Sequence, residues 1–186
     1  MKVDWGSLIV GQVEFYWSVH LRPRLEGLTD EEFFWEPVDG MWSLRPGPDG
    51  AMTVDGAGEP EPTPPPVTTI AWRLVHIAAG IHSRASTFFG DGSVPDDVPM
   101  FDPRHQPATL PSSAAEGLEL LDRSYTWWRD GIAALDDEAL AAPLGPRGAY
   151  FANDPMAALI VHVNRETMQH GAEVCLLRDL YRARLT

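Results

Sequence analysis

The chain has 186 residues, which suits one domain, and its 44% hydrophobic content together with 7 tryptophans provides enough apolar surface for one core. Its formal net charge is −13 and its basic residues are nearly all arginine, so the chain repels phosphate backbones and we expect no nucleic acid ligand. A single cysteine excludes an internal disulfide, and no stretch approaches the ~20 apolar residues that a membrane span needs. We therefore expect one soluble, cytoplasmic domain over residues 1–186, without a signal peptide or a membrane partner.

The first half of the chain contains two predicted long helices separated by an insertion. Apolar residues recur at helical spacing over residues 4–26, and the sequence TDEE at 29–32 reads as a capping box before a short helix. Residues 37–66 are rich in Gly, Pro and Asp, which predicts a long loop or small hairpin. Loops of this length often cover a functional site. The second long helix is expected to start at Thr68 or Thr69 and to end near Gly90.

Two further long helices are predicted in the second half. A proline-rich link, residues 91–111, precedes a helix over about 112–135. The last helix is expected to begin at residue 153 or 154, with Pro155 in its first turn, and to run to about residue 182. Strand-like alternation is not convincing outside the insertion, so the fold class is all-α and the architecture a four-helix bundle.

Two polar residues interrupt the apolar face of the last helix. A helical wheel centred on His170 gathers one apolar stripe: Met156, Leu159, Val163, Val174, Leu177 and Tyr181. Glu166 and His170 lie in the middle of this stripe, and their spacing of four brings the two side chains out one turn apart on the same face. An unpaired carboxylate in a core costs several kcal/mol, so we expect a metal cation, a histidinium or an arginine beside it. A solvated pair or an ordinary buried hydrogen bond is the alternative reading.

Other polar residues of the last helix are assigned plainer roles. Arg178 and Asp179 are expected to be surface or packing charges. Cys175 lies nearly opposite His170, in line with Met168 and Val161, which argues against Cys175 as a ligand. That second apolar line suggests that the back of the helix is covered by the insertion or by a partner, and a homodimer contact is one expectation.

The remaining histidines do not identify a third ligand by periodicity. His105 lies in a proline-rich loop and is expected to be exposed, whereas His20 and His82 are expected to pack against neighbouring side chains. His162 is expected at the boundary of the core, or as a partner that orients a ligand. The wheel places His76 away from the apolar line of its helix, either in solvent or on a cavity wall, and favours solvent slightly.

Two segments of the chain resemble a known family. The run HVNRETMQHGAEVCLLRDLY at 162–181, together with TTIAWRLVHIA at 68–78, resembles the DinB-like superfamily, most closely its actinobacterial members related to the mycothiol-dependent maleylpyruvate isomerases. The resemblance implies a DinB-like four-helix bundle with a divalent metal bound by His76, Glu166 and His170. Many members have histidine where this chain has Glu166. The glutamate resembles the isomerase pattern and implies Zn²⁺ more than Ni²⁺.

The resemblance also gives an expectation of function. Two neutral imidazoles and one carboxylate leave Zn²⁺ with a net charge of about +1 and an open position, an arrangement typical of catalytic zinc. The first expectation is a metal-dependent thiol transferase or isomerase, which uses a low-molecular-weight thiol of the mycothiol type and a small electrophile. A hydrolase that uses a zinc-bound water, and a non-catalytic metal-binding stress-response bundle, are the alternatives. Because Cys175 points elsewhere, the thiol would come from solution.

The two proline-rich loops are expected to surround this site. Loops 37–66 and 91–111 would form its mouth, with Trp35, Trp42 and Trp72 as candidate apolar walls. Core packing is the alternative role for these tryptophans.

Overall fold

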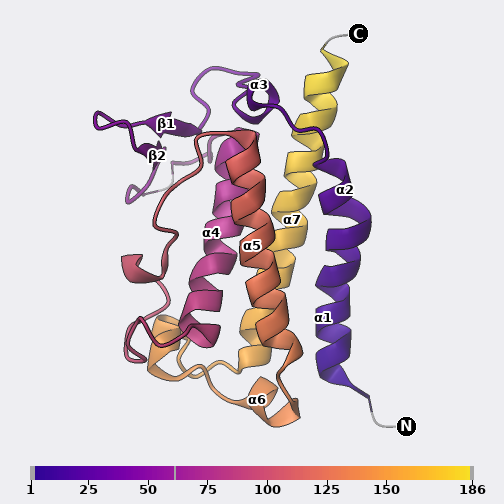
Figure 1. Ribbon diagram of the computed structural model, residues 1–186, viewed down its shortest axis with the longest axis vertical. Helices are drawn as coiled ribbons and strands as arrows, with labels where there is room; N and C mark the ends of the chain where they lie inside the picture. The colour runs from indigo at the N-terminus through magenta and orange to yellow at the C-terminus, as the bar shows by residue number, and fades with distance from the viewer. Residues whose placement is uncertain (1–2, 61, 185–186) are drawn as a thin grey trace.

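The computed structural model describes residues 3–60 and 62–184 and contains four long helical rods with a small hairpin at one side (Figure 1). The rods are α1 (Trp5–Phe15), continued by a π-helical segment (Tyr16–Leu21) and α2 (Arg22–Arg24), then α4 (Ile70–Phe89), α5 (Ala114–Ala133) and α7 (Met156–Ala183). The short elements are α3 (Asp30–Phe33), β1 (Leu44–Pro46), β2 (Met52–Val54), α6 (Asp137–Ala141) and the 3₁₀ turns Pro103–His105 and Gly145–Phe151. The predicted all-α bundle is confirmed.

Capping side chains set the starts of three rods. Asp4 caps α1, Thr69 caps α4 and Ser113 caps α5, each accepting a hydrogen bond from the backbone N–H three residues later. The last helix differs from its prediction by two or three residues. Pro155 is extended, at φ −70° and ψ 153°, and forms an isolated β-bridge with Pro143, so α7 begins only at residue 156.

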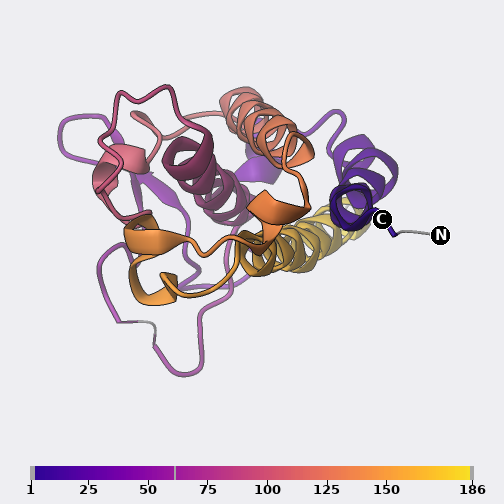
Figure 2. The same ribbon diagram turned by 90° about the horizontal axis from the view of Figure 1, so that it is seen from below.

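The order of directions in the bundle determines the course of its loops. In Figure 1, α1 and α7 run upward, whereas α4 and α5 both run downward. Both α1 and α4 contact α5 and α7, and Figure 2 shows the same four-cornered arrangement from below. Because α4 and α5 are parallel, the link over residues 90–113 returns along α4, whose 20 residues span about 30 Å. This return path brings the link against the face of α4.

The insertion between the first two long rods contains the predicted hairpin. β1 and β2 pair antiparallel, with Leu44 opposite Val54. An isolated parallel bridge between Trp42 and Thr68 ties the two ends of the insertion together just before α4 begins. The insertion therefore sits on the first turns of α4.

The first rod packs closely against the back of α7. At Gly171 an added Cβ would lie 2.6 Å from the Tyr16 hydroxyl, so a side chain there would displace the tyrosine ring. Cys175, one turn further on, is half-buried and packs against the core, and the guanidinium of Arg24 donates to its carbonyl oxygen at 3.2 Å. Here the back of α7 is covered by its own chain. Val161 is 52% exposed, and a homodimer contact stays a prediction.

A buried ion pair joins α3 to the far end of α7. The Arg178 guanidinium donates to both carboxylate oxygens of Glu32, at 2.7 and 2.9 Å, and their side chains are 1% and 4% exposed. Arg178 also donates to the carbonyl oxygens of Arg24 and Glu26. Arg178 is thus a packing charge, whereas Asp179 is a surface charge paired with Arg24.

The expectation that His105 is exposed was wrong. The imidazole is 2% exposed, its Nδ1 lies 2.9 Å from Ser86 Oγ, and its Nε2 lies 3.4 Å from the Val98 carbonyl oxygen. The return of the link along α4 buries His105, whereas Pro103 and Arg104 of the same 3₁₀ turn are exposed, and local composition does not reveal this. Over the described residues, no helix is both long and apolar enough to cross a bilayer.

Candidate metal centre

Three potential metal ligands from two helices meet at the α4–α7 contact. One ligand atom each from His76, Glu166 and His170 lies within 4.8 Å of the others. Three atoms that bind one Zn²⁺ at ~2.1 Å lie roughly 3.4 Å apart, so side-chain movements of about an ångström would close the group on an ion. The structure thus brings together the three residues that the resemblance assigns as ligands.

The ring of His170 has a carboxylate at each nitrogen. Nδ1 lies 3.0 Å from Oε2 of Glu173, and Nε2 lies 3.2 Å from Oε2 of Glu166. A carboxylate only accepts, so Nδ1 carries the proton that it donates to Glu173. In the neutral ring, Nε2 then points a lone pair at a second acceptor. This arrangement needs a cation between His170 and Glu166, either a proton or a metal ion.

An ion pair supports the position of Glu173. The Arg73 Nε lies 2.7 Å from the same Oε2 that accepts from His170. A carboxylate hydrogen-bonded to the outer nitrogen of a histidine is the usual support for a metal-binding imidazole, since it fixes both the tautomer and the ring orientation. The chain Arg73–Glu173–His170 therefore presents Nε2 to the space between α4 and α7.

His76 is held between two rings. The Trp72 indole stacks on it with a centroid distance of 5.2 Å and an angle of 10°, and His170 meets it edge-on at 4.9 Å. The Trp72 indole nitrogen donates to the carbonyl oxygen of Asp55 at 3.0 Å, so the insertion positions the stack. His76 is exposed, but partial burial of its ring, with smaller contributions from His170 and Arg73, lowers its pKa to about 4. The ring is neutral at pH 7 and its lone pair is available.

The other side of Glu166 faces His162 and Arg165. Its Oε1 lies 3.9 Å from Nδ1 of His162 and 3.8 Å from Nε of Arg165. Arg165 Nη2 lies 2.8 Å from the same His162 nitrogen, and an arginine only donates, so this nitrogen accepts. Burial is the main cause that lowers the pKa of His162. His162 is thus a neutral neighbour of Glu166 at the boundary of the site.

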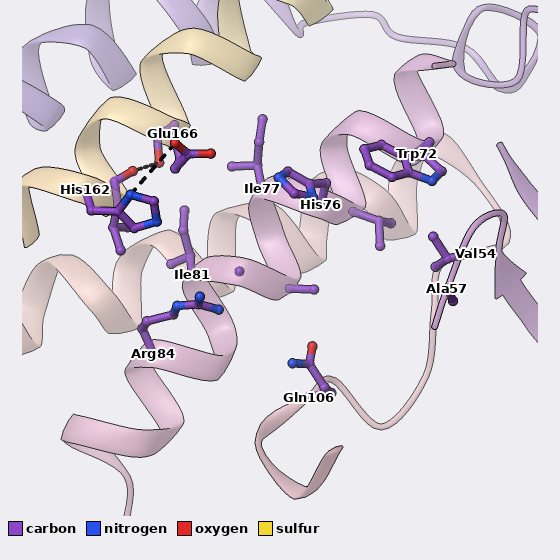
Figure 3. Close-up of a pocket in the computed structure, with 15 residues that line it drawn as sticks. Val54, Ala57, Trp72, His76, Ile77, Ile81, Arg84, Gln106, His162 and Glu166 are labelled. Atoms are coloured by element: carbon purple, nitrogen blue, oxygen red, sulfur yellow. Dashed lines mark hydrogen bonds and ion pairs between the residues drawn. The ribbon is translucent and has the colours of Figure 1, made fainter. Parts of the chain in front are cut away.

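A cavity of about 380 Å³ opens beside these groups (Figure 3). Its apolar wall consists of Val54, Ala57, Trp72, Val75, Ile77, Ala79, Gly80, Ile81 and Val163, and its polar residues are His76, Arg84, Gln106, His162, Glu166 and Thr167. The insertion contributes Val54 and Ala57, and the 90–113 link contributes Gln106, so both loops form the mouth as predicted. This volume suits a small organic ligand.

The three tryptophans expected at the mouth differ in position. Trp72 lines the cavity, and Trp42 packs behind it with ring centroids 5.7 Å apart. Trp35 has the alternative, packing role, because its ring packs on Tyr181 at 5.5 Å, near the C-terminal end of α7.

Comparison of the sequence with models of known protein families gives a match. The DinB superfamily model matches residues 50–174, which include α4, α5 and most of α7. The chain belongs to the DinB superfamily. Curated proteins and solved structures gave no match. All three potential ligands of this DinB chain lie within the matched segment, whereas the first helical rod and α3 lie outside it.

Sequence reasoning missed three polar residues of this DinB site. Glu173 is three residues after His170, so helical spacing alone could have identified it as a partner. Arg84 is eight residues after His76 and lines the same cavity, and no local pattern identified it. Gln106 reaches the cavity only because the link doubles back, for which the local sequence carries no signal.

Proposed function

We propose that this DinB protein binds one divalent metal ion through His76, Glu166 and His170, and that the ion activates a low-molecular-weight thiol for reaction with a small electrophile. The observation that carries the metal is the 3.2 Å approach of His170 Nε2 to Glu166 while Nδ1 is committed to Glu173. A proton would satisfy those two groups alone. A metal ion also uses the lone pair of His76, which has a pKa of about 4 and is neutral at pH 7.

The donor set supports Zn²⁺ as the metal. Two imidazoles and one carboxylate are a ligand set of catalytic zinc sites, in which a fourth position stays open. Imidazole also suits Ni²⁺, which is the second candidate. When bound, Zn²⁺ supplies a deprotonated thiol or hydroxide at neutral pH.

The protein side of the chemistry is positioning and exclusion of water. Glu173 fixes the His170 ring, and Trp72 does the same for His76 by stacking. The apolar wall of the cavity lowers the local dielectric, which strengthens every charge interaction within it. Cys175 cannot supply the thiol, because it packs against the core and burial raises its pKa. We therefore assign the thiol to a small molecule from solution, such as one of the mycothiol type.

Cobalt substitution followed by thiol titration tests this proposal. Co²⁺ is visible in the absorption spectrum, and a thiolate that coordinates it adds a sulfur-to-cobalt charge-transfer band. We expect one equivalent of Co²⁺ to bind, a new band when 2-mercaptoethanol is added, and loss of both in Glu166→Ala and His170→Ala. His20→Ala, which replaces an exposed histidine of the first rod, is the matched control and should retain both.

The outcomes separate the three readings of the site. Tight Co²⁺ binding without a thiol band, combined with an exchangeable water, would favour the hydrolase. Binding without any exchangeable position would favour a structural metal, because structural zinc sites are closed. Failure of the parent protein to bind the ion would refute the metal site itself.

A further inference from the structure

The cavity has a second charged group in addition to the ligand triad. Arg84 extends from α4 eight residues after His76, a rise of about 12 Å along the helix axis. Figure 3 shows its guanidinium and the Gln106 amide reaching into the same space, below Ile81 and away from Glu166. An arginine side chain on a helix leans toward the N-terminal end, here toward His76. The Arg84 guanidinium therefore lies closer to His76 than the rise of about 12 Å between their backbone positions.

The Arg84 guanidinium has few polar contacts with the described part of the protein. Among the described residues, its one hydrogen bond is from Nη1 to Ser83 Oγ at 2.8 Å, and no carboxylate oxygen lies within ion-pair distance. The guanidinium also lies 5.2 Å from the centroid of the Phe101 ring. Four of its five N–H donors thus lack an acceptor within residues 3–60 and 62–184. Arg178, whose side chain is 1% exposed, has both oxygens of Glu32 and two carbonyls instead.

The charge of the cavity contrasts with the charge of the chain. Among the lining residues, Arg84 is the one arginine or lysine and Glu166 is the one carboxylate. With a divalent ion bound, the cavity would carry a net charge of about +2, within a protein of net charge −13. A small anion is attracted to the cavity, whereas a cation is not.

We propose that Arg84 and Gln106 form a carboxylate-binding subsite, which holds one end of the substrate while its electrophilic carbon lies beside the metal. A guanidinium fork binds a carboxylate through two parallel N–H···O bonds, and the Gln106 amide adds a further donor. Between Arg84 and the candidate metal ligands, the apolar wall for a short carbon chain consists of Ile77, Gly80 and Ile81. The substrate class is thus a short-chain carboxylic acid with an electrophilic carbon. The position of that carbon rests on the proposed function, whereas the subsite rests on Arg84 and Gln106.

A series of mercapto acids tests this inference. The probes are straight-chain ω-mercapto acids, from mercaptoacetate to 6-mercaptohexanoate, each compared with its neutral amide. Binding to the Co²⁺-loaded protein is followed by titration calorimetry and by the charge-transfer band. We expect at least one acid to bind about tenfold more tightly than its amide, as one charge-assisted pair allows. In Arg84→Gln this preference should fall to within about twofold, with unchanged metal content.

Two further variants keep the test decisive. Arg165→Gln removes a positive charge that lies 3.8 Å from Glu166 but is 62% exposed outside the cavity, so it should retain the preference for acids. Gln106→Leu alters a loop rather than α4 and should reduce the preference partially, even if Arg84→Gln folds poorly. Equal binding of every acid and its amide, or a preference that survives in Arg84→Gln, would overturn the proposal.

The proposed subsite and the proposed metal centre can be refuted independently of each other. Metal-free protein is titrated with glutarate and with glutaramide, and the parent should prefer glutarate in a manner that Arg84→Gln abolishes. If the parent binds no metal, the proposed function fails, and this comparison still decides whether Arg84 forms an anion site. If metal and thiol bind but acids gain nothing over amides, the subsite alone is refuted.

Discussion

Replacing Glu173 with alanine removes the acceptor that fixes the His170 ring. Its Oε2 lies 3.0 Å from Nδ1 of His170 and 2.7 Å from Nε of Arg73, so the substitution also removes the ion pair with Arg73. Loss of such a partner weakens metal binding by about 10- to 100-fold. The Glu173 side chain is 41% exposed, and water replaces part of the lost contact, so we expect the lower limit, about tenfold or ~1.4 kcal/mol. Glu173→Gln keeps an acceptor without the charge and should lie between alanine and the parent.

A competition titration against a chromophoric chelator measures this change directly. Asp179→Ala is the matched control, because it removes an exposed carboxylate from the same helix without touching the site. It should leave the affinity for Zn²⁺ within about twofold of the parent. If Glu173→Ala also stays within that range, Glu173 does not orient His170, and the tautomer assigned from its acceptor is wrong.

Three predictions concern the rest of the chain. Arg178→Met leaves the buried carboxylate of Glu32 unpaired, so urea denaturation should show a loss of about 3–5 kcal/mol in the free energy of unfolding; a loss below about 1 kcal/mol would contradict the burial of this pair. Tyr16→Phe removes a buried hydroxyl with no hydrogen-bond partner among the described residues, so stability should be unchanged or higher by up to about 1 kcal/mol, and a clear decrease would reveal a partner. Burial raises the pKa of Cys175, so at pH 7.5 less thiolate is present than in free cysteine and iodoacetamide should react more slowly; a rate equal to that of free cysteine would refute this.

The helices of this fold were predictable because their signals are local. Asp4, Thr69 and Ser113 cap helices in the structure at the positions where the sequence places helix starts. The Gly- and Pro-rich links between the long helices further restrict where each helix can begin and end. The π-helical segment was not predicted. It ends directly before α2, in which Pro23 lacks the N–H that an α-helical turn would use, so a wider turn there is physically reasonable.

The candidate site was predictable only where two residues share one helix. The spacing of Glu166 and His170 predicts a shared face, and the structure agrees. His76 required the family resemblance, because a wheel gives the direction of a side chain but not the helix that faces it. The position of Gln106 and the burial of His105 depend on a link that returns along α4, and such long-range contacts leave no local pattern.

Elemental analysis of the purified protein tests the central claim most directly. The parent and the His20→Ala control should each contain about one zinc per chain after dialysis against zinc-free buffer. Glu166→Ala and His170→Ala should fall to background while retaining the helical circular dichroism of the parent. Stoichiometric zinc in both ligand variants, or none in the parent after reconstitution, would contradict the account.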